Sequence, residues 1–227
     1  MEQNSIEWHE ARGGMFTSSK ANDLICTPKK KPRPYIMTRL AERVRGESLD
    51  VQFTNASIEW GIHNEPLAAR QYARRTGATV EKCGFITHPS MYYFGGSPDR
   101  LIVENGKPGI LEIKCPDTHT HLQHCLIDSV DFFKKNYADK YWQCVSNMVI
   151  TGSDFYDFVS FDPRVDADAG LFIFRVPYMR EEADIVLNAV RKAEQELCEV
   201  AERIGVTDLN NKWIELKKSL LTTSKPA

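Results

Sequence analysis

Two carboxylates and an ammonium group lie within a short central stretch of the sequence. Asp99 is followed, after twelve intervening residues, by Glu112, Ile113 and Lys114. Carboxylate oxygens are the ligands that Mg2+ and Mn2+ prefer in proteins. A divalent ion held there can stabilise charge on a phosphate group and lower the pKa of a bound water molecule. These residue types therefore indicate metal-dependent hydrolysis of phosphodiester bonds.

A β-hairpin is the element expected to bring the two carboxylates together. Asn105 and Gly106 form a strong two-residue turn signal, with an apolar, strand-like stretch on each side. Asp99 begins the first arm and Glu112 lies late in the second. Pairing of the arms about the turn makes Asp99 and Glu112 neighbours, and two carboxylates at close range repel unless a cation holds them.

The alternation of side chains along a strand gives each member of the Glu-Ile-Lys triplet a direction. Glu112 and Lys114 share one face, and Ile113 points into the core. The backbone oxygen of Ile113 is a further candidate metal ligand. Lys114 would position or deprotonate the attacking water, or stabilise charge on the phosphate. An ordinary exposed hairpin can carry the same pair, but Glu112 lies in an apolar stretch, where an unpaired carboxylate is costly.

Helix-like and strand-like stretches alternate along the rest of the chain, which predicts an α/β fold in a single domain covering residues 1–227. Pro66 is expected to break or kink its helix, and Gly77 to end it. Helices are expected at about 8–12, 17–24, 35–45, 56–75, 138–150, 181–204 and 210–221, a loop at 28–34, and strands at 85–87, 91–94, 100–103, 109–114, 156–161 and 171–176.

The composition is that of an ordinary globular protein, with 42% hydrophobic and 26% charged residues. No apolar run approaches the roughly 20 residues needed to cross a bilayer, and the N-terminus lacks a secretory signal. The six cysteines form no CxxC pair, which favours reduced thiols in a cytoplasm. We therefore expect a cytoplasmic protein without a membrane partner.

The net charge of −2 argues mildly against binding to nucleic acid, where a basic surface is expected. The charge is distributed unevenly, however, and a basic groove can exist on a protein that is acidic elsewhere. Basic residues gather at 29–33, 70–75, 134–135 and 217–218, and acidic residues at 181–202.

Three further motifs accompany the central one. They are Trp8 to Ser19 (WHEARGGMFTSS), Trp60 to Pro66 (WGIHNEP) and the pair Trp142-Gln143. Together with Pro98-Asp99 and Glu112-Ile113-Lys114, in this order and at these spacings, they resemble the PD-(D/E)xK nuclease superfamily. Within it the chain is similar, over roughly residues 7–180, to the phage lambda exonuclease family of viral-type recombination exonucleases.

This resemblance implies a fold and an activity. The fold is a restriction-endonuclease-like core, with a central mixed β-sheet flanked by helices. The activity is 5′-to-3′ degradation of one strand of double-stranded DNA from a 5′-phosphorylated end. The cofactor is Mg2+, for which Mn2+ can substitute, and the remaining 3′ single strand serves annealing recombination. A chain of this kind is encoded by a bacterial host or by a phage.

The resemblance also gives roles to single residues. Glu65 matches a helix glutamate that reaches the active site, and Gln143 a helix glutamine that orients water or phosphate by hydrogen bonding. Arg12 and Ser19 match a pocket for the 5′-phosphate, since a guanidinium binds phosphate bidentately. If Thr17 or Ser18 caps the following helix, Ser19 has a structural role instead.

Two positions have alternative interpretations of equal weight. Lys29 matches another phosphate contact, but it also belongs to a charged run that is ordinarily solvated. Ile58, seven residues before Glu65, matches an apolar residue that wedges between bases where the duplex opens. An isoleucine at this position of a helix can equally belong to the core.

The family works as a ring of three identical subunits that encloses the DNA, and its expected partner is a single-strand annealing protein. Residues from about 207 to 227 could serve contacts between subunits or with that partner. The enclosed channel would reconcile DNA binding with the near-neutral net charge, since only its lining must be basic.

Three alternatives stay open. The stretch 115–125 contains two cysteines and three histidines, which are zinc ligands, although surface histidines are the expectation because the spacing is unfamiliar. A sequence-specific endonuclease can use the same catalytic motif, but it needs an element that reads base edges. A DNA-end-binding protein without catalysis would keep the fold, but Asp99, Glu112 and Lys114 are all present.

Overall fold

A computed structural model describes residues 3, 5–26, 32–49, 55–166, 168–206, 213, 215 and 217. Its strands are β1 (Phe16–Thr17), β2 (Thr79–Lys82), β3 (Ile86–His88), β4 (Met91–Gly96), β5 (Arg100–Glu104), β6 (Lys107–Lys114), β7 (Phe155–Phe161) and β8 (Leu171–Pro177). Its helices are α1 (Ile6–Arg12), α2 (Ala21–Ile25), α3 (Pro34–Arg45), α4 (Ala56–Thr76), α5 (Thr118–His124), α6 (Val130–Asn136), α7 (Ala138–Thr151) and α8 (Arg180–Arg203), with a 3-10 turn, η1 (Ser18–Lys20).

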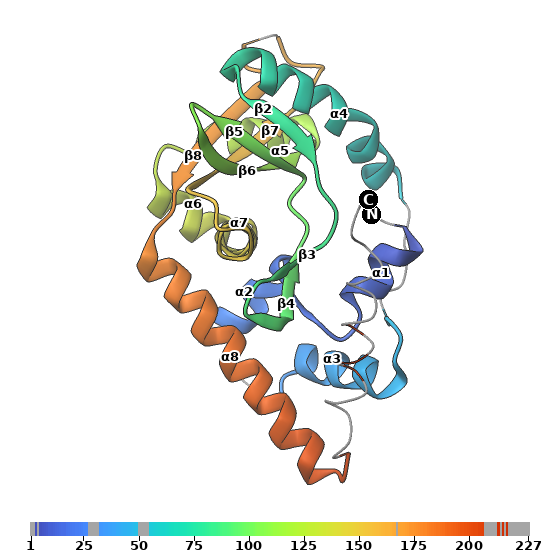
Figure 1. Cartoon of the computed structure of the whole chain (residues 1–227). Coiled ribbons are helices and arrows are strands. Elements are labelled where there is room, and N and C mark those ends of the chain that lie inside the picture. Colours follow the sequence, from blue (N-terminus) through green and yellow to red (C-terminus); the bar gives the residue numbers. More distant parts are fainter. Residues whose placement is uncertain are drawn as a thin grey trace.

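The strands form two sheets. The larger has the order β2-β5-β6-β7-β8, in which β6 and β7 run parallel and the other neighbours antiparallel. The smaller has the order β1-β4-β3. The prediction of a mixed sheet flanked by helices is confirmed, and Figure 1 shows the large sheet beside α4 on one side and α7 on the other.

Alternate residues of the large sheet pack against different helices. Ile110 and Phe158 belong to the hydrophobic core that contains Val145 of α7. Ile113 belongs to a second core, which contains Tyr72 of α4. Because side chains alternate along a strand, Glu112 and Lys114 lie on the α7 face of β6. Helix α7 contacts strands of both sheets. Helix α8 packs against α7 and lies farther from the large sheet (Figure 1).

The turn between β5 and β6 has the geometry that its sequence predicts. Asn105 and Gly106 have φ angles of 52° and 76°, as a two-residue hairpin turn requires. Gly77 ends α4 with a φ of 73°, also as predicted. The expected break at Pro66 is wrong, because α4 is continuous there. The carbonyl that loses its usual partner belongs to Ile62, which is exposed to water.

Several short elements of the structure were not predicted from the sequence. Strand β1 has two residues, β2 has an irregular burial pattern, and α5 and α6 have seven residues each. Helices of two turns are too short for a hydrophobic period to reveal. The prediction for 210–221 lies almost wholly outside the described residues, as does most of the loop at 28–34. Among the described residues, none of the helices has the length and apolar character that crossing a membrane requires.

Candidate active site

The β5–β6 hairpin brings Asp99 and Glu112 together as predicted. Arg100 pairs with Leu111, and Asp99 lies one step beyond this pair. The carboxylate of Asp99 accepts a 2.6 Å hydrogen bond from the backbone N–H of Ile113. Burial, and then the negative charge of Glu112, hold the pKa of Asp99 well above its usual range. The two carboxylates are therefore close enough to repel.

Glu112 is almost completely buried, with 1% of its surface exposed. Its Oε1 accepts two hydrogen bonds of 2.6 Å, one from Lys114 Nζ and one from Gln143 Nε2 on α7. Its Oε2 has no hydrogen-bond partner. A buried carboxylate oxygen without a partner is unfavourable. This oxygen, with the carboxylate of Asp99 nearby, fits a divalent cation.

Lys114 is held in its charged form. Burial alone would lower the pKa of Lys114, but the charges of Glu112 and Asp99 outweigh burial and raise this pKa well above its ordinary value. The side chain is about one-third exposed. It therefore presents an ammonium group beside the two carboxylates, at the edge of the site that solvent can reach.

Glu65 reaches the site from α4 through Arg100. The Oε1 atom of Glu65 accepts a 2.6 Å bond from Arg100 NH1, which also donates to the backbone oxygen of Asp99 at 2.5 Å. The charge of Glu65 contributes to the raised pKa of Asp99. Arg100 is a site residue that was not predicted, although its position directly after Asp99 is a usable signal.

Arg12 is joined to the active-site hairpin by an aromatic residue. Its guanidinium carbon lies 3.9 Å from the ring centroid of Trp8, a cation–π contact. Trp8 Nε1 donates a 2.8 Å hydrogen bond to Ser97 Oγ, two residues before Asp99. The first motif of the sequence and the catalytic motif therefore meet in space, although Trp8 was given no role beforehand.

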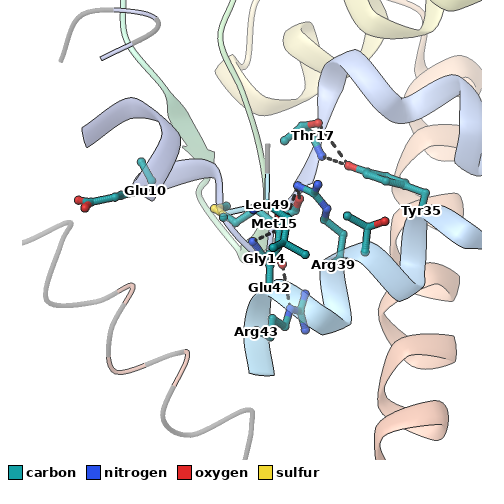
Figure 2. A network of polar contacts seen from close by, with 12 residues as sticks. Glu10, Gly14, Met15, Thr17, Tyr35, Arg39, Glu42, Arg43 and Leu49 are labelled. Carbon is teal, nitrogen blue, oxygen red and sulfur yellow. Dashed lines mark hydrogen bonds and ion pairs between the residues drawn. The ribbon is translucent and has the colours of Figure 1, made fainter. Parts of the chain in front are cut away.

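Ser19 lies in the 3-10 turn η1 and is exposed. Its hydroxyl is 3.3 Å from that of Thr17, which lies 3.3 Å from Tyr35 OH. Thr17 N donates to the same Tyr35 oxygen at 3.0 Å (Figure 2). Thr17 makes no capping bond with its side chain. Burial raises the pKa of Tyr35, and Arg12 is among the nearby charges that oppose this rise, so Arg12 and Ser19 lie around one polar cluster.

The other predicted DNA contacts are Ile58 and Lys29. Ile58 lies in the first turn of α4 with 40% of its surface exposed, so it is not a core residue. Lys29 lies outside the described residues.

The expectation of surface histidines in the stretch 115–125 is wrong for two of the three. His121 and His124 are buried, and the Nδ1 atom of each lies 2.9 Å from Ser160 Oγ. Burial lowers the pKa of His124 to about 4, so it is neutral. The cause is the unpredicted helix α5, which packs on β7. Within the described part of the chain, no three His, Cys, Asp or Glu side chains converge on a metal position.

Among the described residues, therefore, no third His, Cys, Asp or Glu side chain joins Asp99 and Glu112 at the active site. An ion bound by Asp99 and Glu112 would complete its shell with backbone oxygen and water, which is usual for Mg2+. The paired carboxylates, the Glu-x-Lys triplet and the mixed sheet define a nuclease-like protein of the PD-(D/E)xK fold.

The chain belongs to the family of YqaJ-like viral recombinase domains, which it matches over residues 7–154. This is the family of lambda-type recombination exonucleases that the motifs resemble. No curated protein sequence matches the chain significantly.

Solved structures agree with this assignment. The alkaline exonuclease LHK-Exo from Laribacter hongkongensis has 30% sequence identity and a TM-score of 0.72, with 93% of this chain and 100% of that chain covered. LHK-Exo in complex with dAMP aligns with 28% identity over 88% and 98% of the two chains, again with a TM-score of 0.72. A phage-related exonuclease from Haemophilus somnus 129PT, at 15% identity, a TM-score of 0.61 and coverage of 84% and 96%, shares the fold.

Proposed function

We propose that the protein is a magnesium-dependent exonuclease that degrades one strand of double-stranded DNA from a 5′-phosphorylated end. The remaining 3′ single strand would serve annealing recombination. The observation that carries the proposal is the unpaired Oε2 of the buried Glu112 next to the half-buried carboxylate of Asp99. Family membership and the likeness to alkaline exonucleases support the reaction class.

Asp99, Glu112 and the backbone oxygen of Ile113 would hold the metal, with Mn2+ as a substitute for Mg2+. When bound, the ion supplies charge stabilisation at the scissile phosphate and a more acidic water. The carboxylates would hold the ion in a defined place, because a hydrogen bond from Ile113 orients one of them and bonds from Lys114 and Gln143 orient the other. Glu65, paired with Arg100, would orient water at the edge of the site.

The environment of Lys114 favours one of its predicted roles. Because its pKa is raised, Lys114 stays protonated near neutral pH and is a poor base. An ammonium group beside the reacting phosphate stabilises the negative charge that develops during cleavage. Gln143 would keep Glu112 aligned while Lys114 turns towards the substrate.

Arg12 and Ser19 would bind the 5′-phosphate of the strand under degradation. The stacking of Arg12 on Trp8, and the bond from Trp8 to Ser97, give this phosphate site a fixed position relative to Asp99. Such a fixed spacing suits the release of short products from an end. The complex of LHK-Exo with dAMP supports recognition of a nucleoside monophosphate.

The remaining proposals concern DNA and protein partners. Ile58, with its exposed side chain at the start of α4, would separate the two strands, and Lys29 would contact phosphate. We further propose that three copies form a ring around the duplex and that a single-strand annealing protein is the partner. A solution mass three times the 25.9 kDa chain mass would support the ring.

The decisive experiment compares two DNA substrates. End-labelled linear duplex and covalently closed circular duplex are incubated with Mg2+, with Mn2+ and with a chelator. We expect loss of the linear DNA only, and only with metal. Cutting of the closed circle would instead indicate an endonuclease, and binding of linear ends without cutting a non-catalytic end-binding protein. Asp99→Ala and Glu112→Ala serve as inactive controls.

A further inference from the structure

Two residues near the C-terminal end of the sequence bind the backbone around Arg12. Trp213 and Lys217 are both buried, with 3% and 6% of their surfaces exposed. Lys217 Nζ donates hydrogen bonds to the backbone oxygens of Glu10, at 2.6 Å, and Ala11, at 3.1 Å. Trp213 Nε1 donates to the backbone oxygen of Gly13 at 3.3 Å. Two of these carbonyls belong to the residues before Arg12 and one to the residue directly after it.

Lys217 donates its hydrogen bonds to backbone oxygens in the last turn of α1. Arg12 is the last residue of α1, and the final carbonyls of a helix have no partner within it. A cation at this end also complements the helix dipole. Lys217 supplies both effects from more than 200 positions away in the sequence. The position of Arg12 therefore depends on a segment far from the catalytic motif.

The indole of Trp213 fits closely against the chain that follows α1. Its ring lies 4.4 Å from the guanidinium carbon of Arg43 and 5.9 Å from the ring of Tyr92. Gly14 has a φ angle of 73°, and a Cβ there would lie 2.4 Å from Trp213 Nε1. A residue with a side chain at this position would therefore displace the indole.

Helix α3 binds the same stretch of backbone at Gly14. Glu42 Oε2 accepts a 2.8 Å bond from Gly14 N, and Arg43 Nε donates a 2.8 Å bond to Gly14 O (Figure 2). Arg43 also pairs with Glu194 of α8. Gly14 is thus held by α3, and the backbone of Glu10, Ala11 and Gly13 by Trp213 and Lys217.

We propose that Trp213 and Lys217 are positioning residues for 5′-phosphate recognition, acting by holding the backbone on both sides of Arg12. The inference rests on the proposed role of Arg12. Trp8 fixes the face of the guanidinium, and the two C-terminal residues fix the point from which its side chain starts. A phosphate contact is sensitive to small displacements, because bidentate bonds need correct distance and direction.

The test measures the rate on duplex DNA with a 5′-phosphate, divided by the rate on the same duplex with a 5′-hydroxyl. Lys217→Met keeps the apolar stem and removes the donors to Glu10 and Ala11. Trp213→Phe removes the N–H donor to Gly13 and keeps an aromatic ring. Arg12→Ala measures the full loss of the phosphate contact, and Lys217→Arg tests rescue by another cation.

A matched control separates positioning from lost stability. Arg175 of β8 donates bonds of 2.7 and 2.6 Å to the buried carboxylate of Asp157, and Figure 1 shows β8 and α1 on opposite sides of the molecule. Arg175→Met removes the charge-assisted bonds to Asp157 and Glu104 without touching Arg12. Unfolding midpoints of all variants are measured in parallel.

We expect Lys217→Met to lower the phosphate preference by about tenfold, Trp213→Phe to lower it less, and Lys217→Arg to restore part of it. Arg175→Met should leave the ratio unchanged at a similar loss of stability. If Arg12→Ala abolishes the preference while both C-terminal variants keep the wild-type ratio, the inference is wrong and the proposed function stands. An equal fall in Arg175→Met would show a stability effect and also overturn the inference. A wild-type enzyme without any phosphate preference would overturn the proposed 5′-phosphate site, and the inference with it.

Discussion

Gln143 Nε2 donates a 2.6 Å hydrogen bond to Glu112 Oε1, the same oxygen that accepts the bond from Lys114 Nζ. Both donors therefore hold one oxygen of the buried carboxylate and leave Oε2 unpaired. This arrangement orients Glu112 without occupying the atom that a cation would use. Glu112 and Lys114 of the hairpin and Gln143 of α7 thus form one hydrogen-bonded cluster.

The role of Gln143 can be tested with Gln143→Met, which keeps the volume and removes the donor. We expect cleavage of linear duplex with Mg2+ to fall about 10- to 100-fold, the usual effect of removing a hydrogen bond that orients a metal ligand. Binding of Mn2+, measured by calorimetry, should weaken with it. Wild-type kinetics and affinity in this variant would show that Gln143 does not position Glu112.

The sequence alone predicts the catalytic hairpin because its signals are local. The Asn105-Gly106 turn fixes the pairing, and the two-residue period places Glu112 and Lys114 on one face. The contact between the first motif, Trp8 to Ser19, and the catalytic motif cannot be predicted from local signals. The bond from Trp8 to Ser97 spans 89 positions, and no short-range pattern indicates which indole meets which hydroxyl.

The buried histidines show a second limit of pattern analysis. His121 and His124 are polar residues in a ligand-rich stretch, so the sequence indicates a surface or a metal site. Their burial depends on Ser160, which lies between their Nδ1 atoms and arrives from β7. Burying an imidazole without a hydrogen-bond partner costs free energy. Because the sequence does not show that Ser160 is the partner, it does not predict that the two histidines are buried.

Asp99→Asn should abolish cleavage and stabilise the metal-free protein at neutral or higher pH. Burial and the charge of Glu112 raise the pKa of Asp99, so the folded wild type binds a proton more tightly than the unfolded chain does. The stability of the wild type in chelator therefore falls as pH rises from the unfolded pKa through the folded one. The variant lacks this fall, because its amide does not ionise.

Thermal unfolding in chelator tests this prediction at pH 4 and pH 8. The two proteins should be similar at the lower pH, and the variant should melt higher at the upper pH, by about 2–4 °C for each kcal/mol of relieved repulsion. Added Mn2+ should stabilise the wild type more than the variant, because a ligand stabilises the state that binds it. A variant less stable than the wild type at pH 8 in chelator would contradict the charge repulsion inferred here.

Lys114→Met should lose most of the activity and retain metal binding. The ammonium group neutralises Glu112 in the free protein, so its removal leaves more negative charge for a cation. We expect the rate to fall about 100-fold or more, the scale of losing one group that stabilises transition-state charge, with Mn2+ affinity unchanged or higher. Cleavage at the wild-type rate would exclude a catalytic role for Lys114.

The stability contributed by Lys217 should depend on pH in the alkaline range. Burial lowers the pKa of Lys217 to about 8, whereas the unfolded chain keeps the ordinary value of 10.5. Between these values the unfolded state binds more protons than the folded state, so stability rises with pH. The neutral amine still has two N–H groups for the carbonyls of Glu10 and Ala11.

The measurement is the free energy of unfolding of the wild type minus that of Lys217→Met, at pH 7, 9 and 10. Taking this difference removes the titrations that both proteins share. The difference should rise with a slope of at most about 1.4 kcal/mol per pH unit, and parallel pH profiles would show that Lys217 is not buried against α1 in solution.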